Sequence, residues 1–143
     1  MEIMIREMTV NDAAGVKALS HQLGYPLSLD EIAANIRAVA SSEDRVAFVA
    51  ALDNKILGWI GASQAVMIEM LPYCEINGLV IDEKYHGKGI GKRLIERMRQ
   101  WAKEKGNKRL SLRCNIKRTE AHKFYIHLGF TDVKKQTNFV LEI

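Results

Sequence analysis

One segment constrains the fold more than any other, because it predicts a strand, a glycine-rich turn and a helix in immediate succession. Residues 79–81 are apolar and largely β-branched, as in a buried strand. Glycines at positions 87, 89 and 91 follow and lead into a helical pattern of apolar residues. Glycine lets a ligand approach the backbone, and the free N–H groups at a helix start carry partial positive charge. The segment therefore predicts a site for phosphate or pyrophosphate.

The residues around this turn agree with an anionic ligand but exclude two common phosphate-binding patterns. Lys88, Lys92 and Arg93 add positive charge, and His86 offers a further hydrogen-bond donor. A P-loop requires Ser or Thr after its Gly-Lys pair, whereas Arg93 follows Lys92 here. The dinucleotide fingerprint fails in both frames, because its last glycine position holds Lys92 or Leu94.

Two motifs resemble those of the GNAT family of N-acetyltransferases. Residues 86–91, His-Gly-Lys-Gly-Ile-Gly, resemble the pyrophosphate loop of that family, Arg/Gln-x-x-Gly-x-Gly/Ala, at every position except His86. Residues 121–130, Ala-His-Lys-Phe-Tyr-Ile-His-Leu-Gly-Phe, resemble its second signature, Ala-x-x-Phe-Tyr-x-x-x-Gly-Phe. The order and spacing of the motifs also match, and the resemblance covers essentially the whole chain.

The resemblance implies an α/β (α+β) GNAT acyl-CoA N-acyltransferase fold. Its central sheet is mixed and mostly antiparallel, with one splayed pair of strands, and about four helices flank it. A chain of 143 residues has the usual size of one domain, and we see no linker or repeat, so we expect a single domain over residues 1–143. We find neither a long apolar stretch nor a signal-peptide pattern, and we expect a cytoplasmic protein without a membrane span.

The periodicity of the apolar residues predicts the order of the elements. We expect strands at 3–6, 46–52, 56–68, 73–81, 110–114, 130–133 and 138–143, and helices behind the capping boxes 9–12 and 28–31, from 90 to 106 and over 120–128. The first helix runs through Val16, Leu19 and Leu23. Asp53 and Asn54 supply a turn, and Gly58 and Gly61 indicate a bulge or a close backbone approach.

The resemblance implies acetyl-CoA as the cofactor and assigns most of its contacts to the main chain. The pantetheine arm would bond like an added strand to the splayed strand, and the loop would hold the pyrophosphate. The expected coenzyme-binding residues are Leu79, Val80, Ile81, His86, Gly87, Lys88, Gly89, Ile90, Gly91, Lys92, Asn115 and Tyr125. Arg118 is the alternative to Asn115, and a plain core strand is the alternative for residues 79–81.

Two residues are candidates for the proton transfers. Tyr125 matches the family tyrosine that protonates the coenzyme sulfur, and a phenol with a pKa of about 10 keeps its proton at neutral pH. Glu75 lies on the strand where the family often carries an acting glutamate, and Asn77 could hold a water or the substrate beside it. Strand alternation would place Glu75, Asn77, Leu79 and Ile81 on one face. Core packing is the alternative for Tyr125, and a structural hydrogen-bond pair is the alternative for Glu75.

We therefore expect an acyl-CoA-dependent N-acetyltransferase that acetylates a primary amine of a small molecule by direct attack. Transfer to a protein amine and a non-catalytic acyl-CoA sensor are the alternatives. The net charge of +4 suits an anionic cofactor, and without a recognised motif we expect no nucleic-acid partner. Cys74 and Cys114 lack metal-type spacing, so we expect reduced thiols and no metal site. The resemblance also allows a homodimer. Acceptor specificity should come from the first two helices and from residues 23–29 and 67–73.

Overall fold

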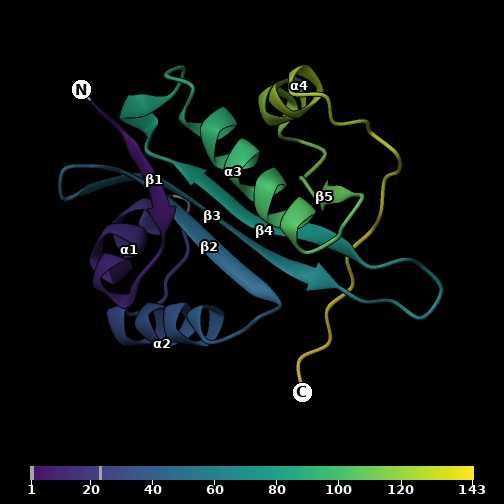
Figure 1. The fold of residues 1–143 in the computed structure, drawn as a ribbon, viewed down its shortest axis with the longest axis horizontal. Helices are drawn as coiled ribbons and strands as arrows, with labels where there is room; N and C mark the ends of the chain where they lie inside the picture. Colours follow the sequence, from purple (N-terminus) through teal and green to yellow (C-terminus); the bar gives the residue numbers. More distant parts are fainter. Residues whose placement is uncertain (1, 23) are drawn as a thin grey trace. The chain divides into compact units, whose positions relative to one another are not determined.

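The computed structural model describes residues 2–22 and 24–143, which form two compact units, one up to Leu112 and one over Arg113–Ile143 (Figure 1). Within the described residues, the first unit is built on a five-stranded sheet, and the second contains the helix α4 (Thr119–His127). Leu23, predicted to lie in the first helix, is outside the described residues.

The sheet of the first unit is mixed and mostly antiparallel, as predicted. Its strands follow the order of the chain: β1 (Met4–Glu7), β2 (Arg45–Leu52), β3 (Lys55–Ala65), β4 (Tyr73–Ile81) and β5 (Leu110–Leu112). The pairs β1–β2, β2–β3 and β3–β4 are antiparallel, and β5 runs parallel to β4. The sheet therefore leaves β1 and β5 as its two edges.

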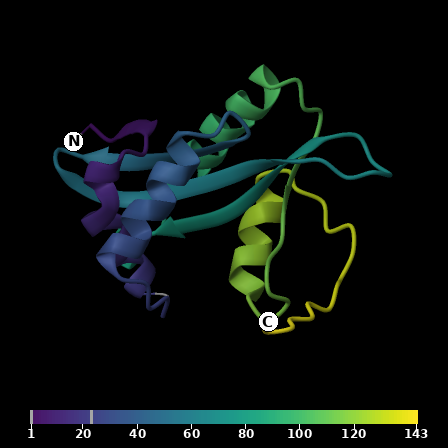
Figure 2. The same ribbon diagram turned by 90° about the horizontal axis from the view of Figure 1, so that it is seen from below.

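Helices cover both faces of this sheet (Figures 1 and 2). The helices α1 (Ala13–His21) and α2 (Leu29–Ala40) cover one face, where their apolar residues share a buried cluster with Val49 and Val80. The helix α3 (Ile90–Glu104) covers the other face, where the guanidinium of Arg97 lies over the ring of Phe48. The amphipathic pattern of α3 explains this placement, because its apolar stripe, including Leu94 and Met98, is fully buried.

Local signals in the sequence set the starts of the helices and the first hairpin. Both predicted capping boxes form. In the second box, the Ser28 N–H donates to Glu31 at 2.9 Å, and the Glu31 N–H donates to the Ser28 hydroxyl at 3.1 Å. Asp53 adopts φ +54° in the turn between β2 and β3, as expected for a residue that tolerates the left-handed conformation.

Two bulges interrupt the pairing of β3, close to the glycines that predicted them. Opposite β2 the register shifts between Ala50 and Ala51, which makes Leu57 of β3 an extra residue. Opposite β3 the register shifts at Gly61, which makes Asn77 of β4 an extra residue. Each bulge bends its strand and increases the local twist. The second bulge matters most, because it lies in the strand that leads to the glycine loop.

Several predicted strand limits are wrong. β3 ends at Ala65 and not at residue 68, and β5 ends at Leu112 and not at residue 114. The predicted closing strands at 130–133 and 138–143 do not form, and the described residues 130–143 contain no strand. Strand propensity is expressed only where a partner strand supplies the hydrogen bonds. Phe139 and Leu141 are instead 90% and 85% exposed.

In the part of the chain that the structure describes, no helix is sufficiently long and apolar to cross a membrane. Both cysteines are free thiols, with Cys74 buried and Cys114 partly exposed.

Candidate active site

The glycine loop has the backbone geometry of an anion site. Gly87 and Gly89 adopt φ +77° and +79°, and a Cβ added to either would meet no atom within 4 Å, so the space over the loop is open. Gly89 is the N-cap residue directly before α3 and has no side chain that could cap the helix. The backbone bonds of α3 start with the Arg93 N–H donating to the Gly89 carbonyl at 3.1 Å. The earlier N–H groups of the first turn therefore point out of the helix start, where an anion can accept them.

A buried aspartate fixes the turn between β4 and this loop. The N–H of Asp82 donates to the Leu57 carbonyl at 2.8 Å, and its side chain accepts from the Lys84 N–H at 3.1 Å. The short 3-10 turn η2 (Glu83–Tyr85) follows, and Lys55 Nζ lies 5.3 Å from the centre of the Tyr85 ring. Sequence reasoning did not assign Asp82. Its place directly after an apolar strand was the available signal, because aspartate often caps such turns.

His86, the departure from the family loop pattern, bonds back to the strand. Its Nε2 lies 3.2 Å from the carbonyl oxygen of Ile81, and the side chain is exposed. The contact requires a hydrogen on Nε2, because a carbonyl oxygen only accepts. The ring is thus held at the end of β4, and it retains Nδ1 for other contacts.

The strand before the loop has an open edge. β4 and β5 pair only through Cys74 with Leu110, Glu75 with Ser111 and Ile76 with Leu112. Among the described residues, no strand pairs with that side of β4 from Asn77 to Ile81. Backbone groups from Asn77 to Val80 on that side can pair with the amides of an extended arm, whereas the Ile81 carbonyl already has His86 Nε2 at 3.2 Å. This geometry fits the pantetheine arm, which the family resemblance predicts to bind along residues 79–81.

The side chains of β4 do not follow the predicted alternation. Cross-strand partners share a face, and the partners of Trp59, Gly61 and Ser63 in β3 are Val80, Gly78 and Glu75. Val80 belongs to the apolar cluster of α1 and α2, so Glu75 also faces that side.

Leu79 pairs with Ile60 and Ile81 pairs with Gly58, so both face the side of α3. The predicted common face of Glu75, Asn77, Leu79 and Ile81 is therefore wrong. The extra residue Asn77, which is exposed, shifts the alternation by one position. As a consequence, Glu75 lies on the face opposite Leu79 and Ile81.

A family model described as "Acetyltransferase (GNAT) family" matches residues 16–130. The chain belongs to the GNAT acetyltransferase family. It is accordingly an acyl-CoA-dependent N-acetyltransferase, with acetyl-CoA as its acetyl donor. The open edge of β4 and the N-terminus of α3, which no side chain caps, fit that coenzyme.

Curated relatives carry names of the same activity. The chain is 29% identical over 142 residues to the aminoalkylphosphonate N-acetyltransferase of Salmonella typhimurium, which covers 94% of this chain and 86% of the relative. It is 28% identical over 111 residues to the uncharacterized N-acetyltransferase YhdJ of Bacillus subtilis, which covers 77% of this chain and 78% of the relative.

Solved GNAT structures share the fold. The aminoglycoside N-acetyltransferase AAC(6')-Iy, in complex with the bisubstrate analogue CoA-S-monomethyl-acetylneamine, superposes with a TM-score of 0.88 at 19% identity over 100% of both chains. AAC(6')-Ih of Acinetobacter baumannii gives a TM-score of 0.84 at 18% identity over 99% of both chains. The predicted GNAT fold is thereby confirmed.

The unit over Arg113–Ile143 contains the remaining predicted site residues. The centre of the Tyr125 ring in α4 lies 5.4 Å from the centre of the Phe124 ring and 5.8 Å from that of Phe130. Burial raises the pKa of the Tyr125 phenol above its ordinary value, the nearby Cys114 raises this pKa further, and Arg118 opposes both effects. The phenol therefore keeps its proton at neutral pH, as a proton donor must. Its place beside the coenzyme stays a prediction.

Asn115 shapes the turn that precedes α4. Its Oδ1 accepts from the Lys117 N–H at 2.9 Å, and its carbonyl oxygen accepts from the Arg118 N–H at 3.0 Å. His122 Nε2 lies 2.8 Å from the same carbonyl, a contact that sequence reasoning missed because it joins residues seven positions apart. Whether Asn115 or Arg118 contacts the coenzyme stays a prediction.

The role of the glycine loop in coenzyme binding can be tested by adding a single methyl group to it. Gly89→Ala should weaken coenzyme A binding about 5- to 30-fold, because the free loop relieves the strain of an L-residue by leaving this positive φ and coenzyme binding must restore it at a cost of about 1–2 kcal/mol. Gly106→Ala is the matched control, because Gly106 has φ +83° and open space but lies after the C-terminal end of α3. Calorimetric titration should show wild-type affinity for Gly106→Ala. Equal affinities in the two variants would contradict a coenzyme site at this loop.

Proposed function

We propose that this GNAT enzyme transfers the acetyl group to the primary amine of a small molecule by direct attack. The proposal rests on the arrangement of β4. Its open edge from Asn77 to Ile81 leads into the glycine loop, and Glu75 lies on the face opposite Leu79 and Ile81. An acceptor amine and the coenzyme arm could thus approach one strand from different sides. Relatives named for aminoalkylphosphonates and aminoglycosides support a small acceptor.

Each step has a proposed residue. Bound acetyl-CoA supplies the acetyl group as a thioester. The backbone of residues 79–81 orients the pantetheine arm, and residues 86–92 hold the pyrophosphate. Glu75 takes a proton from the amine, directly or through a water held by Asn77, so that the nitrogen lone pair can attack the thioester carbon. Tyr125 gives its phenolic proton to the sulfur as the carbon–sulfur bond breaks.

The state of Cys74 supports direct attack. This thiol is fully buried, and its burial, together with the nearby Glu75, raises its pKa to about 11. The thiolate is the nucleophilic form of cysteine, and very little of it exists at neutral pH at that pKa. An acetyl-cysteine route through Cys74 is therefore disfavoured.

Thiol release from acetyl-CoA with a panel of acceptors tests the proposal. The panel comprises aminoalkylphosphonates, aminoglycosides, polyamines, amino acids and short peptides. Release with a small amine is expected. Release with peptides alone would favour the protein-acetylating alternative. Tight coenzyme binding without release on any acceptor would favour the sensor alternative.

The base can be tested through the pH dependence of the rate. Glu75→Gln keeps the shape of the side chain but removes the proton acceptor, so turnover should fall about 100-fold and the acidic limb of the pH–rate profile should flatten. Glu83→Gln, at an exposed position in η2, is the control and should retain the limb. A variant at position 75 with an unchanged acidic limb would assign the base to another group.

Acceptor selection is proposed for the connection between β3 and β4. Val66, Ile68 and Leu71 in this segment are largely exposed, and Glu69 adds a negative charge that attracts a cationic amine. The homodimer, the cytoplasmic location and the single-domain organisation over residues 1–143 stay predictions.

A further inference from the structure

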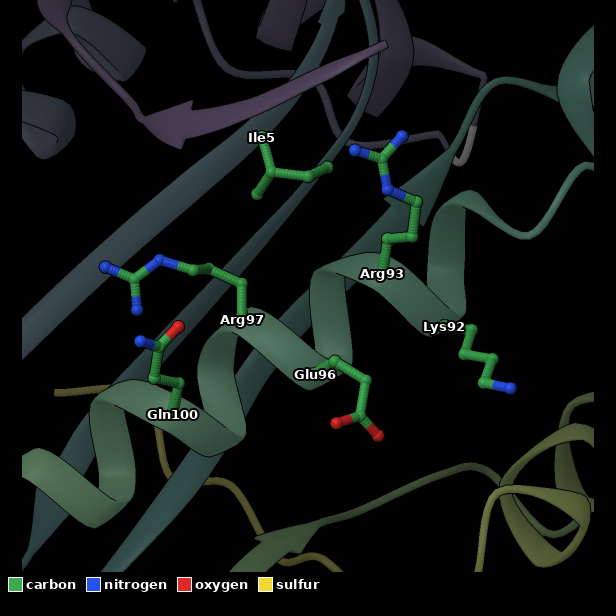
Figure 3. A pocket seen from close by; sticks show the side chains of 6 residues that line it. All are labelled: Ile5, Lys92, Arg93, Glu96, Arg97 and Gln100. Carbon is green, nitrogen blue, oxygen red and sulfur yellow. The ribbon is translucent and has the colours of Figure 1, made fainter.

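A charged groove lies between the edge strand β1 and the helix α3. Its volume is about 540 Å³, and its lining residues are Ile5, Lys92, Arg93, Glu96, Arg97 and Gln100. Figure 3 shows that Arg93, Arg97 and Gln100 project from α3 on the side of Ile5, whereas Lys92 and Glu96 point to the other side of the helix. The part of the groove next to β1 therefore carries two guanidinium groups and one amide.

Arg97 has a buried N–H group without a hydrogen-bond acceptor among the described residues. Its guanidinium carbon lies 4.4 Å from the centre of the Phe48 ring, which covers one face of the group. Stacking on a ring does not satisfy the N–H bonds, which lie in the guanidinium plane. Its Nη1 is buried and has no hydrogen-bond partner among the described residues. A buried charged donor without a partner is unusual in a native structure, so the site indicates a missing acceptor.

The neighbours of Arg97 increase the preference for a negative group. Arg93 lies one helical turn earlier on the same face, and like charges at this spacing repel each other. Arg93 Nη2 donates to the Ile3 carbonyl at 2.9 Å, which holds this second guanidinium at the rim of the groove. The Glu96 carboxylate lies 4.0 Å from Arg99 Nη1 and points away from the Arg97 side of the helix (Figure 3).

We propose that this groove binds a small oxyanion ligand other than the coenzyme, through a carboxylate or phosphate group held by Arg97 and Arg93. The guanidinium fork matches both groups, because each offers two oxygens to parallel N–H donors. The Gln100 amide can donate a further bond, and Ile5 adds an apolar wall for a short carbon chain. The site is independent of the acceptor proposed above, since it uses the edge of β1 and not the open edge of β4.

The test measures thermal unfolding with inorganic phosphate or citrate at constant ionic strength, in saturating coenzyme A so that the glycine loop is occupied. Arg97→Met keeps an apolar stem over Phe48 and removes the guanidinium. Arg99→Met is the control, because Arg99 lies on the same helix, is 60% exposed and is absent from the groove lining. One anion should raise the melting temperature of the wild type and of Arg99→Met, with an affinity at least tenfold lower in Arg97→Met.

A second measurement on the wild type remains decisive if Arg97→Met does not fold. The Nε–H resonances of Arg93 and Arg97 should shift saturably during titration with the same anions. A response to phosphate alone assigns a phosphorylated ligand, and a response to citrate alone assigns a carboxylate. Resonances that do not move with either anion, or equal stabilisation of Arg97→Met and the wild type, would overturn the proposal.

Discussion

Tyr125→Phe should lower turnover at saturating substrates about 100-fold or more and leave coenzyme affinity nearly unchanged. The variant removes one hydroxyl and keeps the ring, so the contacts with Phe124 and Phe130 persist and the fold should be retained. Burial raises the pKa of this phenol, and the wild-type enzyme therefore holds the proton ready at neutral pH. Without that proton the thiolate must leave unprotonated, which raises the barrier of the chemical step.

Assays of thiol release measure turnover, and calorimetric titration measures coenzyme affinity, so the two measurements separate an effect on the chemical step from an effect on binding. Tyr85→Phe is the control, because it also removes one phenolic hydroxyl but lies in η2, with its ring near Lys55. It should retain wild-type turnover. Full turnover in Tyr125→Phe would remove this residue from the mechanism, whereas weaker coenzyme binding at unchanged turnover would assign it a binding role.

The glycine loop and the helix starts were predictable from the sequence, because neighbouring residues determine them. The positive φ of Gly89 reflects a conformation that glycine adopts freely. The capping box of Ser28 and Glu31 closes over three residues. Such features depend little on distant parts of the chain, and the pattern of residues 86–91 therefore predicted the geometry of the candidate coenzyme site.

The face occupied by Glu75 was not predictable by simple alternation. The sequence indicates irregularity near Gly61, but the position of the extra residue depends on how β3 pairs with β4. A Cβ at Gly78 would lie 2.6 Å from the Trp59 ring, which shows how closely that ring covers this part of β4. The bulge at Asn77 then places Glu75 and Leu79 on opposite faces. Only the register of two strands distant in sequence reveals this.

Contacts between residues distant in the sequence explain the other differences between the predicted and the observed structure. Residues 138–143 have the composition of a strand, yet no strand forms there among the described residues, because composition does not supply a pairing edge. The stacking of Arg97 on Phe48 joins a helix to a strand almost fifty positions away and leaves no periodic signal. Contacts between residues far apart in the sequence, such as this one, are therefore the features that the sequence pattern does not predict.

Asp12→Asn should lower the free energy of unfolding at pH 7 by about 1–2 kcal/mol, since it breaks an ion pair in which Asp12 is buried but Arg6 is 38% exposed to water. The Asp12 side chain is 6% exposed, and its two oxygens accept from Arg6 at 2.8 and 2.9 Å. Oδ2 also accepts from the Thr9 N–H at 2.8 Å, which closes the first capping box. The contact joins β1 to the start of α1, so its loss should loosen the packing of that helix on the sheet.

The same contact predicts a pH dependence of stability. The hydrogen bonds from Arg6, more than any other cause, hold the pKa of Asp12 below its ordinary value, although burial opposes them. The folded chain therefore binds this proton less readily than the unfolded chain. The stabilisation is present above the ordinary carboxyl pKa of about 4 and is lost as the pH falls through the lower folded value.

Urea unfolding from pH 7 to pH 2 checks both effects of Asp12→Asn. The wild type and the exposed control Asp44→Asn should lose stability steeply below about pH 4, and Asp12→Asn should show a shallower acid slope from a lower starting value. If Asp12→Asn retained the wild-type acid slope, the acid sensitivity would arise from other carboxylates. A loss at pH 7 as small as that of Asp44→Asn would show that the capping box holds without the Arg6 pair.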